Sequence, residues 1–233
     1  MRRPSIAVLM DENTSSGGTR YEAHKGFFHL LADAGGAPFG VAYDGRLATQ
    51  VLASFDGLLT AGGRFAFPAD WYVTPPPDGG IETARLELET TLVRGFLAAG
   101  KPVLGMCAGM QTLACLHGAR LTPGVPGHDG GVMHEAKVQA GSRLAALVGS
   151  AIRVNSYHRE AIAELPPDVV ASAVSADGVI EAIELPGHRF AMGLQWHQEL
   201  LPPDHPGREI LAAFVREAGR RAGENAPLRA RPA

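Results

Sequence analysis

The chain has 233 residues, of which 45% are hydrophobic and 19% charged, a balance that argues against a disordered chain and against a membrane protein. Its net charge of -3 offers no basic surface for nucleic acid or anionic lipid, so we expect a small-molecule partner, no nucleic acid and no membrane. This length favours one α/β domain, which we place at 1–222.

The first half of the chain alternates between short apolar segments and amphipathic helical segments. The apolar runs predict strands, and the segments between them predict helices. Because two of these runs are almost wholly apolar, both faces of their strands should be buried, as in a parallel sheet between two layers of helices. The predicted strands are 6–10, 38–41, 57–60 and 103–106, and the predicted helices are 21–34, 47–54 and 81–99.

The second half is rich in predicted strands, with few helices between them. A final helix should run from about 207 to 222, and the Pro- and Arg-containing segment 223–233 should be a flexible tail. The loop at 61–80 is too long for a simple connection, and such loops usually border a functional site. The predicted strands of this half are 132–139, 152–154, 169–175, 179–184 and 190–195.

Cys107 lies at the end of the apolar run 103–106, within Gly-Met-Cys-Ala-Gly and before a helical pattern. This is the strand, turn and helix context in which a nucleophile elbow presents its reactive side chain. Glycines two residues before and after leave room for the sharp turn, and the positive end of the following helix favours a thiolate. A small core residue at a tight turn is the alternative interpretation of Cys107.

A thiol nucleophile needs a base, and the base needs a third group that fixes its tautomer. His197 and Glu199 are two residues apart after the predicted strand 190–195, so on extended chain their side chains project to the same side. Separately, each has a simpler explanation as a surface or core residue. Six other histidines have no acidic partner at a convincing spacing, so we expect no metal site. They are His24, His29, His117, His128, His188 and His205.

Two stretches with histidines, at 134–135 and 155–158, stay open at this stage. The oxyanion formed during attack on a carbonyl needs preorganised donors. The amide of Ala108, at the start of the helix after Cys107, is one candidate. The segment 61–64 with its paired glycines is the second, although a simple turn explains it equally well.

The two cysteines, Cys107 and Cys115, lie eight residues apart in one predicted helix, which places them roughly 12 Å apart. Bridged cysteines have Cα atoms about 4.4–6.8 Å apart, so these two cannot pair. The N-terminal apolar run is also too short for a signal peptide. Both features favour a reducing cytoplasm.

Four motifs in one order, DGLLTAGG, KPVLGMCAGMQ, VNSYHREAI and GLQWHQE, span nearly the whole chain. In these motifs the chain resembles the class I glutamine amidotransferase-like superfamily and, within it, the gamma-glutamyl-gamma-aminobutyrate hydrolases of the peptidase C26 type. The resemblance implies a flavodoxin-like three-layer α/β sandwich with a mainly parallel sheet. The chain departs from the hydrolase pattern at four positions that could shape the amine side of the pocket: Ala61, Ala108, Arg159 and Gln198.

The resemblance implies a catalytic triad of Cys107, His197 and Glu199 that hydrolyses gamma-glutamyl amides through a thioester, with no cofactor and no metal. The partner is then a small gamma-glutamyl substrate. Whether the chain forms a homodimer stays undecided at this stage. Two alternatives stay open as well: a glutaminase subunit that delivers ammonia to a separate synthase, and a catalytically idle binding domain. The implied oxyanion and substrate residues are Gly62, Gly63, Ala108, Gln111, Asn155, Ser156, Tyr157 and His158.

Overall fold

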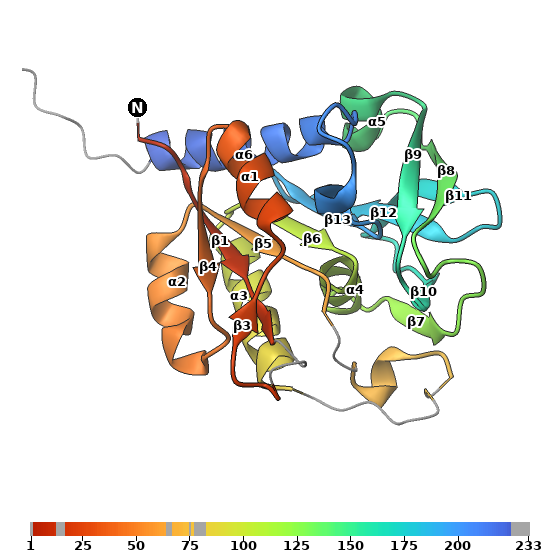
Figure 1. Cartoon of the computed structure of the whole chain (residues 1–233), viewed down its shortest axis with the longest axis horizontal. Helices are drawn as coiled ribbons and strands as arrows, with labels where there is room; N and C mark the ends of the chain where they lie inside the picture. The colour runs from red at the N-terminus through yellow and green to blue at the C-terminus, as the bar shows by residue number, and fades with distance from the viewer. Residues whose placement is uncertain (1, 13–16, 64–66, 75, 77–82, 225–233) are drawn as a thin grey trace, which may run out of the picture.

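The computed structural model describes residues 2–12, 17–63, 67–74, 76 and 83–224 (Figure 1). Its main feature is a nine-stranded sheet with helices on both faces. The strands across this sheet are, in spatial order, β4 (Ala37–Val41), β1 (Ser5–Leu9), β5 (Gly57–Thr60), β6 (Val103–Met106), β13 (Ala191–Leu194), β12 (Ile180–Glu184), β11 (Val170–Ser175), β8 (Val132–Val138) and β9 (Ala151–Ser156).

Helices pack against the sheet in two layers. Side chains of α2, α3 and α4 contribute to one hydrophobic cluster, and side chains of α1, α5 and α6 to the other. Successive residues of β1 alternate between the two clusters, so both faces of this strand are buried, as predicted. The helices are α1 (Lys25–Asp33), α2 (Ala48–Ser54), α3 (Ala84–Ala98), α4 (Ala108–Cys115), α5 (Arg143–Val148) and α6 (Arg208–Glu224), with 3-10 turns η2 (Gly45–Leu47), η3 (Ala69–Trp71) and η4 (Gln198–Leu200).

The sheet has a parallel half and an antiparallel half. Strands β4, β1, β5, β6 and β13 run parallel, and from β13 to β9 every neighbouring pair is antiparallel. Strand β6 lies between β5 and β13, with Gly105 opposite both Thr60 and Gly193. The carboxyl ends of these three strands therefore meet at one edge, where open α/β sheets place their sites. This confirms the predicted α/β sandwich with a strand-rich second half.

Several element boundaries differ from the prediction because local capping decides them. The helix predicted at 21–34 begins only at Lys25, since the ring of His24 accepts a hydrogen bond from the amide of Gly26, 3.1 Å away. Helix α3 begins at Ala84 with Thr83 as its cap. The sequence patterns missed α5, which Ser142 caps.

Two short ladders were also missed, β2 (Asp11–Glu12) with β3 (Tyr21–Glu22) and β7 (Arg120–Pro123) with β10 (Glu160–Glu164). Helix α6 continues through 223–224, and the rest of the expected tail lies outside the described residues. The long loop at 61–80 is described only in part, and that part contains η3. Among the described residues, none of the helices combines the length and apolar character needed to span a bilayer.

Candidate active site

Cys107 is the one non-glycine residue with positive φ among the described residues, at φ 52° and ψ -110°. This backbone conformation costs of order 1–3 kcal/mol in free energy and marks a residue that its surroundings hold in place. The amide of Cys107 donates to Leu194 O on β13 at 2.7 Å, and its carbonyl accepts from Met110 and Gln111 at the start of α4. The predicted elbow is therefore present, with the thiol above the first turn of a helix.

The two glycines that frame the elbow are required by close backbone approach. A Cβ atom at Gly105 would lie 2.4 Å from the carbonyl oxygen of Gly109. A Cβ atom at Gly109 would lie 2.3 Å from Oγ1 of Thr60 on the neighbouring strand. Both distances are shorter than any normal carbon contact, so a side chain at either position would displace the strand-to-helix turn.

His197 follows β13 and lies beside the elbow. Its Nδ1 atom is 2.6 Å from Oε1 of Glu199, which is 9% exposed. Because this carboxylate accepts the hydrogen bond from Nδ1–H, the Nε2 atom is the one available to the substrate and to Cys107. The structure therefore brings the three predicted triad residues together.

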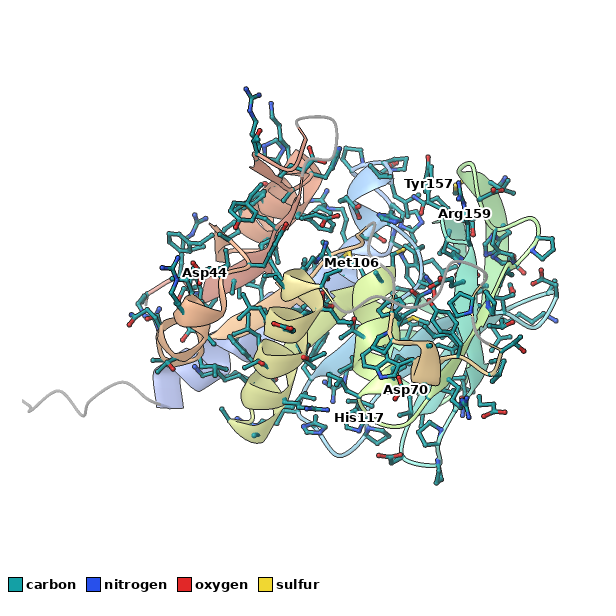
Figure 2. The ribbon with its side chains drawn as sticks, turned by 90° about the horizontal axis from the view of Figure 1, so that it is seen from below. Asp44, Asp70, Met106, His117, Tyr157 and Arg159 are labelled. Atoms are coloured by element: carbon teal, nitrogen blue, oxygen red, sulfur yellow. The ribbon has the colours of Figure 1, made fainter. Side chains whose placement is uncertain are left out.

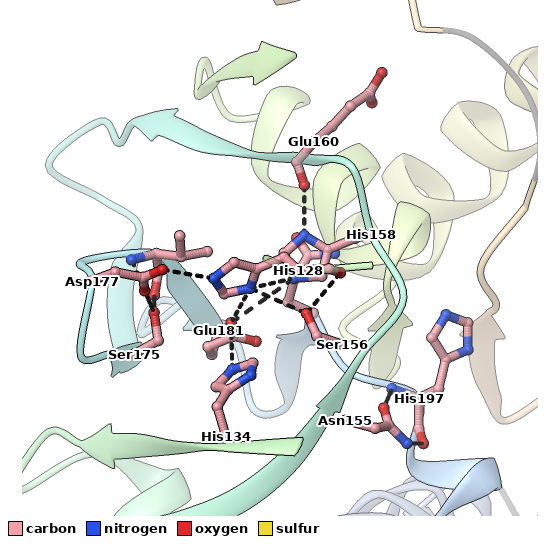
Figure 3. Close-up of polar contacts among 12 residues, drawn as sticks. His128, His134, Asn155, Ser156, His158, Glu160, Ser175, Asp177, Glu181 and His197 are labelled. Atoms are coloured by element: carbon pink, nitrogen blue, oxygen red, sulfur yellow. Dashed lines mark hydrogen bonds and ion pairs between the residues drawn. The ribbon is translucent and has the colours of Figure 1, made fainter. Parts of the chain in front are cut away.

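Asn155, at the end of β9, holds the backbone of His197 at two points. Its Nδ2 atom donates to the carbonyl of His197 at 2.9 Å, and its Oδ1 atom accepts from the amide of His197 at 2.8 Å (Figure 3). The ring of Tyr157 meets the imidazole edge to face, with 5.7 Å between centroids. The antiparallel half of the sheet therefore positions the histidine of a site built on the parallel half.

The imidazole of His197 is held in its charged form. Burial lowers the pKa of His197, but hydrogen bonds with Cys107 and Glu199 and the negative charges of both groups outweigh burial and raise this pKa to about 10. Cys107 lies at the N-terminus of α4, the positive end of that helix.

The loop after β5 approaches the same point. A Cβ atom at Gly62 would lie 2.8 Å from Cε1 of His197 and 3.3 Å from Cβ of Cys107, so only glycine fits there. The guanidinium of Arg85 on α3 donates to the carbonyls of Ala61 at 2.7 Å and Gly62 at 3.3 Å.

In a trans peptide the carbonyl and the following N–H point in opposite directions. With the carbonyls of Ala61 and Gly62 turned to Arg85, the N–H groups of Gly62 and Gly63 therefore face away from it. Gly62 and Gly63 line a cavity together with Cys107.

Arg85 was not found from the sequence. Within a helical segment an arginine normally indicates a solvated face, yet this one is buried, with its side chain 3% exposed. Ion pairs with Asp11 at 2.8 Å and with Glu89 at 3.5 Å neutralise it. Its partners lie 23 and 24 residues away on the glycine loop, so no local pattern reveals them.

Two cavities meet at Cys107. One, of about 730 Å³, is lined by residues at the start of α1, the glycine loop and the triad. The other, of about 870 Å³, is lined by Ala108, Gln111 and the segment that joins β9 to β10, which carries Tyr157 and Arg159 (Figure 2). Cys107, Gly63 and Tyr157 line both, so the sulfur lies where one bound molecule could extend to either side.

The predicted substrate residues are distributed unevenly over this site. Tyr157 is 49% exposed and lines both cavities. Gln111 and His158 line the larger cavity but are nearly buried, and Gln111 donates to Glu160 O at 2.9 Å. Ser156 is fully buried, lines neither cavity, and donates to the carbonyl of His128 at 2.9 Å.

The second cysteine, Cys115, lies in the hydrophobic core, and burial raises the pKa of its thiol. It is a packing residue, in line with the absence of a glycine frame around it. The expectation that His128 lacks an acidic partner is wrong, because its ring lies 3.0 Å from Oδ2 of Asp177 and 3.4 Å from Oε1 of Glu181. These carboxylates lie about fifty residues further along the chain, beyond the reach of sequence spacing.

The peptidase C26 family model matches residues 4–199. Gamma-glutamyl-gamma-aminobutyrate hydrolase PuuD of Escherichia coli is 26% identical, with 85% of this chain and 87% of that protein covered. A Mycobacterium tuberculosis protein named as a glutamine amidotransferase is 40% identical over 64% of this chain, and the match spans about half (52%) of that longer relative.

A solved structure from Thermoplasma acidophilum, assigned as one subunit of a GMP synthase, superposes with a TM-score of 0.71 at 19% identity. The match covers 96% of this chain and 98% of the other. The likeness establishes the glutamine amidotransferase-like fold of the chain.

Proposed function

Because the chain belongs to the peptidase C26 family, we propose that it hydrolyses gamma-glutamyl amides through a gamma-glutamyl thioester on Cys107. The observation that carries this proposal is the geometry of the triad, with Cys107 on a strained elbow, the ring of His197 beside it, and Glu199 2.6 Å behind the imidazole. Acyl transfer from an amide needs these three groups in this order.

In the acylation half of the reaction, the thiolate of Cys107 attacks the gamma-carbonyl carbon and a C–S bond forms. The oxygen becomes an oxyanion, which the N–H groups of Ala108 and of Gly62 or Gly63 stabilise, each donor contributing about 10²–10³-fold in rate. As the oxyanion collapses, the C–N bond breaks and Nε2 of His197 transfers its proton to the departing amine. The products are the thioester, a free amine and a neutral imidazole.

In the deacylation half, the neutral imidazole of His197 takes a proton from a water molecule that attacks the thioester carbon. The C–S bond breaks, glutamate leaves, and the thiolate and imidazolium are restored. Glu199 keeps Nδ1 protonated throughout, so that Nε2 alone exchanges protons.

We assign the glutamyl group to the larger cavity and the amine to the smaller one. Arg159, which the sequence pattern associates with the amine side, lines the larger cavity and supplies a cation for the alpha-carboxylate there. Asp129 and Glu160 line the same cavity and supply carboxylates for the alpha-ammonium group. In the smaller cavity, Lys25 and the start of α1 suit an amine that carries a carboxylate, as gamma-aminobutyrate does.

A glutaminase that supplies ammonia to a synthase is the second candidate, and the likeness to the solved GMP synthase structure favours it. The two functions share the thioester and differ in the amine that leaves. In the glutaminase, the leaving group is ammonia, which a separate synthase would use.

The test is a substrate panel with the purified chain alone. Glutamine and gamma-glutamyl amides of gamma-aminobutyrate, a neutral amine and a diamine are incubated with the chain, and glutamate and ammonia are measured. We expect glutamate from the gamma-aminobutyrate amide at a higher kcat/KM than from glutamine. Turnover of glutamine alone would favour the glutaminase, and no turnover of any substrate would favour an idle domain.

Three variants make the panel specific. Cys107→Ser should abolish turnover, whereas Cys115→Ser, which changes the other buried cysteine, should keep it. Lys25→Met should raise KM for the carboxylate-bearing amide and leave KM for the neutral amide close to that of the unchanged chain. Equal effects on both amides would contradict our assignment of the smaller cavity.

A further inference from the structure

Three histidines and one glutamate gather about the antiparallel half of the sheet. We call His128, His134, His158 and Glu181 the histidine cluster (Figure 3). His128 comes from the loop before β8, His134 from β8, His158 from the segment after β9, and Glu181 from β12. The cluster has no part in the mechanism described above, and its members come from four separate segments.

The hydrogen bonds around the cluster fix which ring nitrogens lack a proton. Nδ1 of His158 lies 2.9 Å from the carbonyl of Glu160, so this nitrogen carries the hydrogen and donates it. Nε2 of His128 lies 3.0 Å from a carboxylate oxygen of Asp177 and donates in the same way. In the neutral rings, the bare nitrogens are therefore Nδ1 of His128 and Nε2 of His158.

These two bare nitrogens face each other at 3.2 Å, and Oε1 of Glu181 lies 3.4 and 3.9 Å from them. Three lone-pair donors thus converge on one point, and the hydroxyl of Ser156 lies 3.1 Å from Nδ1 of His128. A proton shared within the group or a metal ion at its centre would relieve the repulsion among these lone pairs. Carboxylate and carbonyl partners behind ligating imidazoles are the usual surroundings of metal-bound histidines.

The spacing of the three atoms fits a metal ion. A cation equidistant from them would lie about 2 Å from each, which is the length of Zn–N and Zn–O bonds. Two imidazoles and one carboxylate are a ligand set that suits zinc and similar first-row divalent ions. The second carboxylate oxygen of Glu181 is buried and has no hydrogen-bond partner among the described residues, so it can complete the coordination.

Burial supports a cation as well. His128 and His158 are each 3% exposed and Glu181 is fully buried. Buried charged groups are paired or coordinate a metal, so a carboxylate ligand in this position is stable beside a cation.

We propose that His128, His158 and Glu181 bind a divalent zinc-type ion, with His134, 3.0 Å from Oε1 of Glu181, as the group that orients the carboxylate. A cavity of about 320 Å³ lined by His128, His134 and Asp177 gives the ion a path from the surface. The ion joins three segments, one of which carries Asn155 and Tyr157 against His197, and so steadies the histidine side of the active site without taking part in the chemistry.

The experiment uses the full chain with Cys107→Ser, so that no thiolate at the triad competes for the metal. The protein is stripped of metal with EDTA, dialysed and titrated with Zn²⁺. The number of zinc ions bound per chain is then measured by inductively coupled plasma mass spectrometry. We expect one zinc per chain. X-ray absorption spectroscopy of the loaded protein should show nitrogen and oxygen ligands at about 2.0 Å with histidine scattering and no sulfur.

Three variants in the same Cys107→Ser background locate the ion. Glu181→Gln should abolish stoichiometric binding, and Asp177→Asn, which removes the carboxylate behind His128, should weaken it about 10–100-fold. His29→Gln, at an exposed histidine outside the cluster, should bind zinc as the parent does. If Glu181→Gln does not fold, two other measurements decide whether the ion lies in the histidine cluster. They are the X-ray absorption spectrum of the Cys107→Ser parent and the zinc affinity of Asp177→Asn.

Absence of stoichiometric zinc on the folded parent would overturn the proposal and leave a shared proton as the occupant of the cluster. Full zinc affinity in both Glu181→Gln and Asp177→Asn, or sulfur among the ligands, would overturn it by placing the ion elsewhere.

Discussion

The charge state of His197 is the single-residue property on which the reaction depends. An imidazole in water is mostly neutral at pH 8, because its pKa is near 6.5. In this site burial opposes the charge, yet the hydrogen bond with Cys107 and the carboxylate of Glu199 raise the pKa of His197 to about 10. The raised pKa means that the proton needed by the leaving amine is already present at neutral pH.

This raised pKa predicts an NMR result. At pH 8 the ring of His197 should be protonated at both nitrogens, as seen in ¹⁵N spectra of histidine-labelled protein, and it should titrate near pH 10. Cys107→Ser removes a partner that raises the pKa, so the titration should move toward lower pH in that variant. A ring that is neutral at pH 8 in the unchanged chain would contradict the thiolate and imidazolium pair.

Residues with local signals were predictable from the sequence, and residues with distant partners were not. Cys107 lies between two glycines, a strand and a helix that are contiguous in the chain, and His197 and Glu199 are only two residues apart. Arg85 and His128 act through partners that lie more than twenty residues away, so only the fold brings them together. Their roles can be recognised only when the fold brings the loop after β5 to Arg85 and β12 to His128.

At the scale of elements, the site depends on how closely α4 approaches the strand that precedes it. Gly105 lies where a Cβ atom would meet the backbone of Gly109 at 2.4 Å. Gly105→Ala should therefore lower the free energy of unfolding by about 1–3 kcal/mol. Gly187→Ala, at a turn where a Cβ atom meets nothing within 4 Å, should stay within about 0.5 kcal/mol of the unchanged chain. Urea denaturation of both variants measures this, and equal stabilities would contradict the close approach.

The β5 loop depends in the same way on α3. Arg85→Lys keeps a positive charge beside Asp11 and Glu89 but loses the guanidinium that holds the two carbonyls of the loop. If the N–H groups of this loop form the oxyanion hole, kcat should fall by about 10²-fold or more, with little change in KM. Arg46→Lys, at an exposed ion pair, is the control and should keep the unchanged kcat. A rise in KM with constant kcat would assign Arg85 to substrate binding instead.

At the scale of the whole molecule, the two halves of the sheet have different tasks. The parallel half carries the glycine loop and Cys107, the proposed nucleophile, at the carboxyl ends of β5 and β6. The antiparallel half carries Asn155 and Tyr157, which hold and face His197, and it also contains the histidine cluster. The alternation of strands and helices predicts the first half well, because each of its elements buries a recognisable apolar face.

In the second half the five predicted strands are confirmed as β8, β9, β11, β12 and β13, whereas β7, β10 and α5 were missed because they are short and set by pairing. Strand β10 has five residues and pairs with β7, and α5 has six residues between a serine cap and Gly149. Sequence periodicity over so few residues distinguishes poorly between strand, helix and loop. The motifs of the site were nonetheless visible, since they lie at strand ends where glycine and polar residues interrupt apolar runs.

The most direct test of the proposed chemistry is detection of the acyl-enzyme. The purified chain is mixed with gamma-glutamyl-gamma-aminobutyrate, quenched in acid during turnover, and examined by intact-protein and peptide mass spectrometry. We predict a single gamma-glutamyl adduct on the peptide that contains Cys107, absent in Cys107→Ser and unchanged in Cys115→Ser. Turnover without any adduct on Cys107 in the rapid-quench series, or an adduct on another residue, would contradict the proposed thioester mechanism.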